Sequence, residues 1–211
     1  MTHDLLLALI SFAFVTSVTP GPNNVMLMAA GVNFGFVRTV PHMVGISLGH
    51  GLMVFLVGLG LAGVFEAVPT AKLALKAASV AYMLWLAWKI AHSAPPGDAP
   101  ALVEAALVGP SGAAKARGQP MTFLQAAAFQ WVNPKAWAMA LGAISTYGQG
   151  GVASVVLVCA VFACVNLPSV ALWAFAGERL RVLLADPRRL ARFNWTMAGL
   201  LVLSLWPVLT M

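Results

Sequence analysis

Apolar residues dominate six stretches of the chain, and polar or Pro/Gly-rich segments separate them. A helix needs roughly 20 mostly apolar residues to cross the hydrocarbon of a bilayer, and each stretch nearly reaches that length. The predicted spans are residues 5–34, 41–64, 73–90, 121–146, 152–176 and 193–210. The pattern therefore predicts an all-α membrane protein with six transmembrane helices.

Two proline breaks interrupt corresponding spans. One is Thr19-Pro20-Gly21-Pro22-Asn23-Asn24 in the first span, and the other is Asn133-Pro134-Lys135 in the fourth. Irregular backbone at membrane depth is tolerated where protein buries it or where it lines a cavity. Paired broken helices are typical of the binding sites of transporters built from repeats. The breaks therefore predict a small-solute carrier with its site between them.

The two halves of the chain are predicted to be structural repeats. We expect residues 1–92 and 121–211 to form three spans each, with a loop at 93–120 between them. A shift of 114 positions places Pro20 on Pro134. Because three spans per half is an odd number, the two repeats must have opposite orientations in the membrane. This is the inverted-repeat design of many carriers, here with broken first and fourth helices.

Composition and charge fit this picture. The 211 residues are 61% hydrophobic and 9% charged, far from the values of soluble proteins. The net charge of +6 is attributed to membrane topology, since the basic residues form no patch interleaved with aromatic side chains. We therefore expect a lipid bilayer and no nucleic acid among the partners. The segment before Leu5 has no Lys or Arg, so the first span is expected to be retained and not cleaved as a signal peptide.

Lysine and arginine predict the orientation of the chain. Two of them, Lys72 and Lys76, fall on one side of the predicted membrane, and Lys135 lies inside a span. The other nine fall on the opposite side: Arg38, Lys89, Lys115, Arg117, Arg179, Arg181, Arg188, Arg189 and Arg192. Cytoplasmic loops carry the excess of Lys and Arg. We therefore predict that both termini face outward and that the loop at 93–120 is cytoplasmic.

The breaks offer groups for both ends of a zwitterion. A proline frees the carbonyl four residues earlier, so the carbonyls of Thr16, Val18 and Gln130 are expected to be free. Asn23 is expected to cap a restarted helix, whose N-terminus attracts a carboxylate, while carbonyl and amide oxygens suit an ammonium group. The alternative is a pair of kinks that only help helices to pack. The predicted substrate-binding residues are Pro20, Gly21, Pro22, Asn23, Asn24, Gln130, Asn133, Pro134 and Lys135.

Lys135 is the basic residue that lies well inside a span. Charges within the membrane are costly and usually functional, so we expect Lys135 to pair with a substrate carboxylate or to respond to protons. The alternative is a lysine that extends along apolar surface to the headgroups. Acidic residues fall near span ends or in loops, so the sequence predicts no buried carboxylate relay.

Two further features lie in the second span. His50 could relay protons, but the more conservative interpretation is a histidine hydrogen-bonded between helices. Gly45 and Gly49 form a small-residue face, which favours close packing of helices, with homodimerisation as the alternative. Trp131 and Trp137 flank the second break and are expected to pack around it.

These motifs resemble the LysE/RhtB amino-acid exporters. The resemblance rests on Thr19-Pro20-Gly21-Pro22-Asn23 and on Asn133-Pro134-Lys135-Ala136, with support from residues 45–51 and 75–85, and it covers nearly the whole chain. It implies a six-helix, multi-pass protein of the bacterial inner membrane that exports amino acids or their derivatives and uses the proton gradient. Ala78 and Ala81 stand where that family would have a glycine near the tyrosine, which affects packing more than the site.

Other functions remain as alternatives. An exporter of a metal cation would need clusters of Cys, His or carboxylates inside spans. A membrane thiol oxidoreductase would need a reactive cysteine in each repeat, whereas Cys159 and Cys164 both fall in the fifth span. A membrane scaffold without transport activity is a further alternative. The sequence favours a transporter over an enzyme, and it predicts neither a cofactor nor a metal site.

Overall fold

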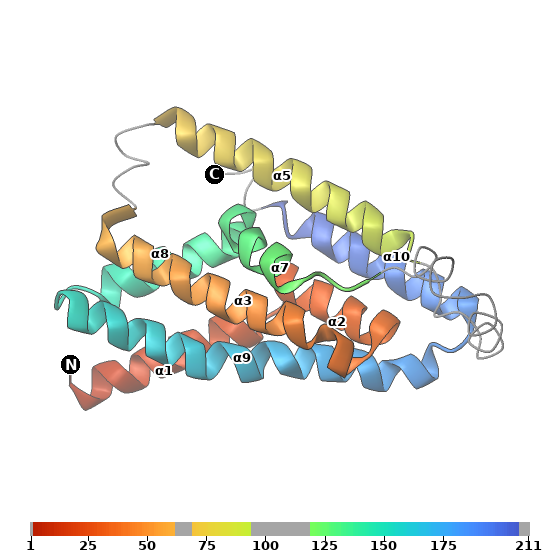
Figure 1. Cartoon of the computed structure of the whole chain (residues 1–211), viewed down its shortest axis with the longest axis horizontal. Coiled ribbons are helices and arrows are strands. Elements are labelled where there is room, and N and C mark those ends of the chain that lie inside the picture. Colours follow the sequence, from red (N-terminus) through yellow and green to blue (C-terminus); the bar gives the residue numbers. More distant parts are fainter. Residues whose placement is uncertain (1, 62–68, 94–118, 207–211) are drawn as a thin grey trace, which may run out of the picture.

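The computed structural model describes residues 2–61, 69–93 and 119–206 as an assembly of helices (Figure 1). The loop predicted at 93–120 and the ends of the second and sixth spans lie largely outside these residues. The helical elements, in chain order, are α1 (His3–Val18), α2 (Pro22–Phe34), α3 (Phe36–Leu56), η1 (Val57–Leu61), α5 (Pro69–Ala91), α7 (Phe123–Phe129), η2 (Gln130–Val132), α8 (Pro134–Tyr147), α9 (Val152–Leu183) and α10 (Pro187–Leu203).

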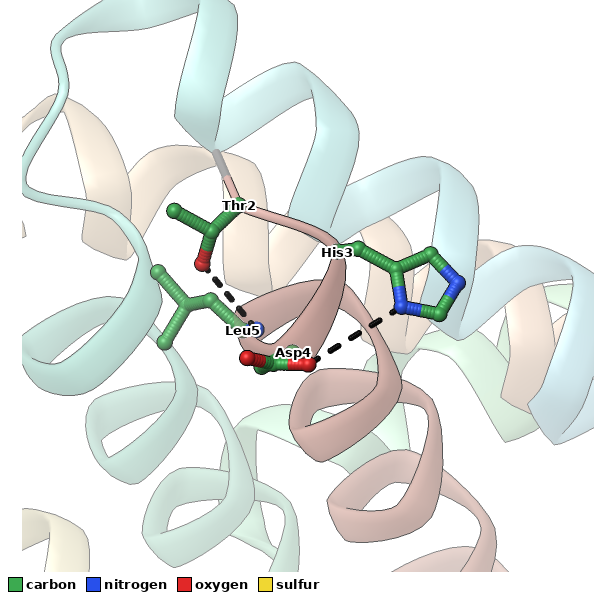
Figure 2. A network of polar contacts seen from close by, with 4 residues as sticks. All are labelled: Thr2, His3, Asp4 and Leu5. Carbon is green, nitrogen blue, oxygen red and sulfur yellow. Dashed lines mark hydrogen bonds and ion pairs between the residues drawn. The ribbon is translucent and has the colours of Figure 1, made fainter.

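The first helix begins with a local polar cap (Figure 2). The hydroxyl of Thr2 accepts a hydrogen bond from the N–H of Leu5 at 3.4 Å, which satisfies one donor of the first turn. Asp4 lies in that turn, where the helix dipole favours a negative charge, and the side chain of His3 is 3.9 Å from it. Thr2, His3 and Asp4 are all exposed, so the cap fixes the start of α1 without adding to the core.

Among the residues that the structure describes, length and composition identify three helices that could cross a membrane: Phe36–Leu61, Leu73–Ala91 and Val152–Leu183. The pair α1 and α2, bent by 52° at the first break, makes a fourth if it is counted as one span. The elements α7, η2 and α8 are too short individually, and α10 has 17 residues that include several arginines. The all-helical membrane architecture is confirmed, whereas six spans stay a prediction.

Several helix boundaries differ from the predicted spans. α3 starts at Phe36 and includes Pro41, and α9 continues past Ala176 to Leu183. α10 starts at Pro187, because the Asp186 carboxylate accepts hydrogen bonds from the N–H groups of Arg188 and Arg189 and caps the helix there. The predicted spans end where the apolar runs end, but a helix can continue beyond such a run through polar residues.

Glycines allow the closest contacts between helices. A Cβ on Gly31 of α2 would collide with the carbonyl oxygen of Ala174 in α9, and a Cβ on Gly177 of α9 would collide with that of Met28 in α2. The two glycines thus let each backbone touch the other. Gly45 and Gly49 of α3 likewise lie against α7, as the packing interpretation predicted.

The remaining helices complete two sides of the assembly. α5 and α10 lie side by side along one side, and α1, α2 and α9 follow the other (Figure 1). α10 also contacts α2, where the buried amides of Asn33 and Asn194 form a hydrogen bond of 3.0 Å. This arrangement leaves the two breaks between α1, α2, α7, α8 and α9.

Candidate functional site

The first break separates α1 from α2. α1 ends at Val18, Thr19 has extended backbone angles, and α2 restarts with Pro22 as its first residue and Gly21 as its N-cap. Proline is well suited to this first position because the N–H that it lacks would be unsatisfied there in any case. The predicted interruption is therefore confirmed at the predicted residues.

Protein groups satisfy the three carbonyls that were expected to be free. The Thr16 carbonyl accepts from the hydroxyl of Thr19 at 3.2 Å, and the Gln130 carbonyl accepts from the N–H of Asn133 at 3.2 Å. The Val18 carbonyl accepts from the indole N–H of Trp173 in α9 at 3.0 Å. The prediction that these carbonyls are free is wrong, because each finds a hydrogen-bond donor within the fold.

Asn24 holds the broken segment together. Its amide nitrogen donates to the carbonyls of Ser17 and Thr19, each at 2.8 Å. The side chain is buried and therefore reaches back across the break from α2 to the end of α1. The geometry of the break is thus fixed by a side chain inside the motif itself.

Asn23 joins the two breaks and does not cap α2. Its amide nitrogen donates to Oε1 of Gln130 at 2.9 Å, and Nε2 of Gln130 donates back to Oδ1 of Asn23 at 3.2 Å. The expected cap is wrong because Pro22 is already the first helical residue, which leaves Asn23 inside the first turn. α2 has no side-chain cap, so its first-turn N–H groups remain available to another acceptor.

At the second break the capping residue is Asn133. Asn133 Oδ1 accepts from the N–H of Lys135 at 3.1 Å, and Pro134 opens α8. The N–H of Trp137 bonds to the Asn133 carbonyl, and its indole N–H donates to the Trp131 carbonyl at 2.9 Å. The two tryptophan rings also contact each other edge to face, so they brace this break from both sides.

Lys135 reaches from the second break to the first. Its ammonium donates to the Thr19 carbonyl at 2.8 Å, to the Thr19 hydroxyl at 2.9 Å and to the Pro20 carbonyl at 3.4 Å. Within the described residues, no carboxylate lies near enough to form an ion pair with it. The positive charge is therefore held by neutral oxygens beside the N-terminus of α2.

Gly21 provides the room for that lysine. Its backbone is extended, a conformation that any residue adopts, so conformational freedom does not require glycine here. A Cβ at this position would lie 2.6 Å from Cδ and 3.0 Å from Nζ of Lys135. The absence of a side chain at residue 21 thus allows the lysine to lie against the break.

A pocket of about 310 Å³, with its opening to solvent, lies between the breaks, and we name it the break pocket. Five of the predicted substrate-binding residues line it, together with the predicted histidine; Gln130 lies behind Asn23, and the prolines shape the backbone. The lining residues are Thr16, Ser17, Gly21, Asn23, Asn24, His50, Asn133, Lys135, Ala136, Met139, Asn166 and Val170.

His50 lines this pocket without the expected hydrogen bond. It is 2% exposed and its ring packs edge to face on Phe162, yet neither ring nitrogen has a hydrogen-bond partner among the described residues. The interpretation of His50 as a histidine bonded between helices is therefore wrong. Its nitrogens are left for a group that enters the pocket.

A buried chain of polar side chains, which was not predicted from the sequence, joins the break to α9 and α3. Asn166 donates to the Ser17 hydroxyl at 3.2 Å and accepts from the Ser47 hydroxyl at 3.0 Å. Trp173 was missed as well. An asparagine close to Pro168 in an apolar span is a signal that could have identified Asn166, whereas nothing local indicates the partner of Trp173.

The described residues contain no group of three or more His, Cys, Asp or Glu side chains that could hold a metal ion. The break pocket instead combines hydroxyls, amides, one ammonium and an uncapped helix N-terminus. Such groups bind carboxylate and ammonium ions without chemistry on the ligand.

A family model described as "LysE type translocator" matches residues 14–207, and the chain belongs to this family of multi-pass inner-membrane transporters. Curated relatives named cysteine/O-acetylserine efflux protein occur in Escherichia coli (strain K12) and Shigella sonnei (strain Ss046). Each is 30% identical over 206 residues, which cover 96% of this chain and 96% of the relative. No solved structure matches the chain significantly.

Proposed function

We propose that this protein exports small neutral amino acids of the cysteine and O-acetylserine type from the cytoplasm, and that the break pocket binds them. The observation that carries the proposal is the meeting of the Lys135 ammonium with the uncapped N-terminus of α2 at a break in the first helix. The names of the efflux relatives support the substrate class.

The substrate carboxylate is assigned to the first break. The N–H groups of Asn23 and Asn24 open α2, where the helix dipole favours an anion, and the Lys135 charge lies beside them. In the present structure Lys135 donates to oxygens of Thr19 and Pro20. A carboxylate is a stronger acceptor than a carbonyl, so the substrate would draw the ammonium away from them.

The substrate ammonium is assigned to amide oxygens that line the pocket. Asn133 and Asn166 lie in the lining and offer neutral acceptors. Neutral acceptors suit a zwitterion with an uncharged side chain, because no acidic residue is among the residues that line the pocket. A substrate with a basic side chain would bring an additional positive charge close to Lys135, and no acidic residue in the lining would neutralise it.

We infer six spans in two inverted repeats. In this scheme α1–α2, α3 and α5 form one repeat, and α7–α8, α9 and α10 form the other, with α7–α8 and α10 as the fourth and sixth spans. The matching order of a broken helix followed by two further helices supports the scheme. Export would use the proton gradient, and His50 is assigned as the proton-responsive group because it lines the pocket with unpartnered nitrogens.

Transport into inside-out vesicles tests the proposal. Vesicles containing the protein are expected to accumulate labelled O-acetylserine and cysteine but not lysine, and a proton gradient is expected to increase the accumulation. Vesicles with Lys135→Met protein at the same density serve as the control. Equal accumulation in both preparations would contradict transport through the break pocket.

Asn133→Ala is expected to abolish export because it removes a group of the binding site, and not because it makes the protein unstable. Removing a helix cap costs about 1 kcal/mol in the free energy of unfolding. Thr122→Ala is the matched control, since Thr122 caps α7 through the N–H of Gln125 but does not line the pocket. Both variants should lower the melting temperature similarly, whereas only Asn133→Ala should lose uptake. Loss of uptake in both, or in neither, would remove Asn133 from the site.

The orientation is testable by cysteine labelling. In a background with Cys159 and Cys164 replaced by serine, Thr2→Cys is expected to react with an impermeant thiol reagent in intact cells. Ser111→Cys, in the predicted cytoplasmic loop, is expected to react only after the cells are opened. The excess of Lys and Arg on the side of residue 111 is the physical reason. The opposite labelling pattern would reverse the topology.

A further inference from the structure

A second pocket, of about 830 Å³ including its opening to solvent, lies at the far end of α2 from the break, and we name it the His42 pocket. Its walls come from the C-terminal half of α2, from α3, from the end of α5 and from the residues that precede α7. Met26, Leu86 and Met121 give it a mostly apolar surface. None of its lining residues lines the break pocket.

His42 is the buried polar side chain of this pocket that lacks a hydrogen-bond partner among the described residues. It is 1% exposed, and neither ring nitrogen has a hydrogen-bond partner among the described residues. Other polar side chains of the lining are occupied: Asn33 bonds to Asn194, Ser93 to the Lys89 carbonyl, and His92 to the Trp88 carbonyl. An unpartnered buried polar group is costly, so His42 is the group that a ligand would satisfy.

We propose that the His42 pocket is a first binding site for the exported amino acid on its way from the cytoplasm to the break pocket. This inference rests on the proposed export function. A neutral imidazole has one N–H and one acceptor nitrogen, and an α-amino acid has a carboxylate that accepts and an ammonium that donates. The apolar wall suits a small uncharged side chain.

The charges around the pocket favour the same ligand. Lys89 is exposed at the pocket, and no Asp or Glu is among the residues that line it. The carboxylate therefore faces a cation. Lys89 also belongs to the side of the chain that the excess of Lys and Arg predicts to be cytoplasmic.

The two pockets lie along the same two helices, α2 and α3. α2 lines the His42 pocket with Met26, Ala29 and Asn33 and lines the break pocket with its first turn. His42 and His50 are eight residues apart on α3, or about 12 Å at 1.5 Å per residue. The two histidines are thus about two helical turns apart, which sets the distance a ligand would travel from the first pocket to the second.

Single reporter cysteines can monitor the pockets separately. In the background with Cys159 and Cys164 replaced by serine, Ser93→Cys reports on the His42 pocket and Thr16→Cys reports on the break pocket. The rate of labelling by a thiol reagent is measured in detergent-solubilised protein with and without O-acetylserine. Solubilised protein makes both sides accessible, so the result does not depend on the orientation.

O-acetylserine is expected to slow the labelling of both reporters severalfold. His42→Phe should remove the protection of residue 93 and leave that of residue 16. Lys135→Met should do the opposite. Protection of residue 93 that persists in His42→Phe, disappears in Lys135→Met, or is missing from the start would overturn the proposal.

His50→Phe is the matched control for the histidine substitution. It replaces the other buried, unpartnered histidine of α3 and should leave the protection of residue 93 unchanged. Phenylalanine removes the unsatisfied nitrogens in both variants, so both should melt no lower than the parent. If the protein does not export the substrate, a different result is expected. Residue 16 is then unprotected and vesicles accumulate no substrate, while residue 93 is still protected.

Discussion

Lys135→Met is expected to abolish export while the protein stays folded in the membrane. Methionine keeps the length and apolar character of the side chain but removes the charge that the substrate carboxylate needs. The acceptors that Lys135 leaves are little affected, since the Thr19 carbonyl retains the Asn24 amide and the Thr19 hydroxyl retains its bond to Thr16. We expect uptake into vesicles to fall at least about tenfold, which corresponds to about 1.4 kcal/mol.

Lys135→Arg separates a binding role from a packing role. A guanidinium has the same charge but a planar fork of donors, which differs in shape from an ammonium held by three oxygens. The arginine variant should therefore recover little of the lost uptake. Full activity of Lys135→Met at matched protein density would show that the charge plays no part in transport.

Gly21→Val is expected to abolish export by moving Lys135. Even the first carbon of the new side chain would lie 2.6 Å from Cδ of Lys135, so the flexible lysine must leave the break. Because the backbone at residue 21 is extended, valine causes no conformational strain there. Uptake should fall as in Lys135→Met, while the melting temperature should change little.

Gly199→Val is the matched control for this substitution. Gly199 is exposed on α10, and a Cβ there meets no atom within 4 Å. The two variants should reach the membrane in equal amounts, and only Gly21→Val should lose uptake. If Gly21→Val exports normally, the contact between Gly21 and Lys135 is not needed for transport.

The position of the site was predictable because proline chemistry is local. Pro20, Pro22 and Pro134 lack an N–H, so a continuous helix could not pass through them, and α2 and α8 restart there. The capping residue was not predicted: the cap expected from Asn23 is absent, and Asn133 caps α8 instead. The exposed apolar surface of the helices was likewise predictable from the hydropathy pattern.

The partners across the site were not predictable because they come from distant segments. Gln130 and Asn23 are 107 residues apart, and Trp173 is 155 residues from the Val18 carbonyl that it satisfies. A sequence pattern identifies which groups lose a local partner, but not which distant side chain replaces it. For the same reason the unpartnered state of His42 and His50 emerged only from the packing.

The reciprocal glycine contacts between α2 and α9 restrict how these two helices can move. Each backbone fits against the other at Gly31 and Gly177, so a relative rotation of these helices would bring main-chain atoms into collision. We therefore expect α2 and α9 to move together. An exchange of access between the two sides of the membrane is then expected to bend the chain where helical hydrogen bonding is already interrupted, as at residues 19–21 and at Asn133.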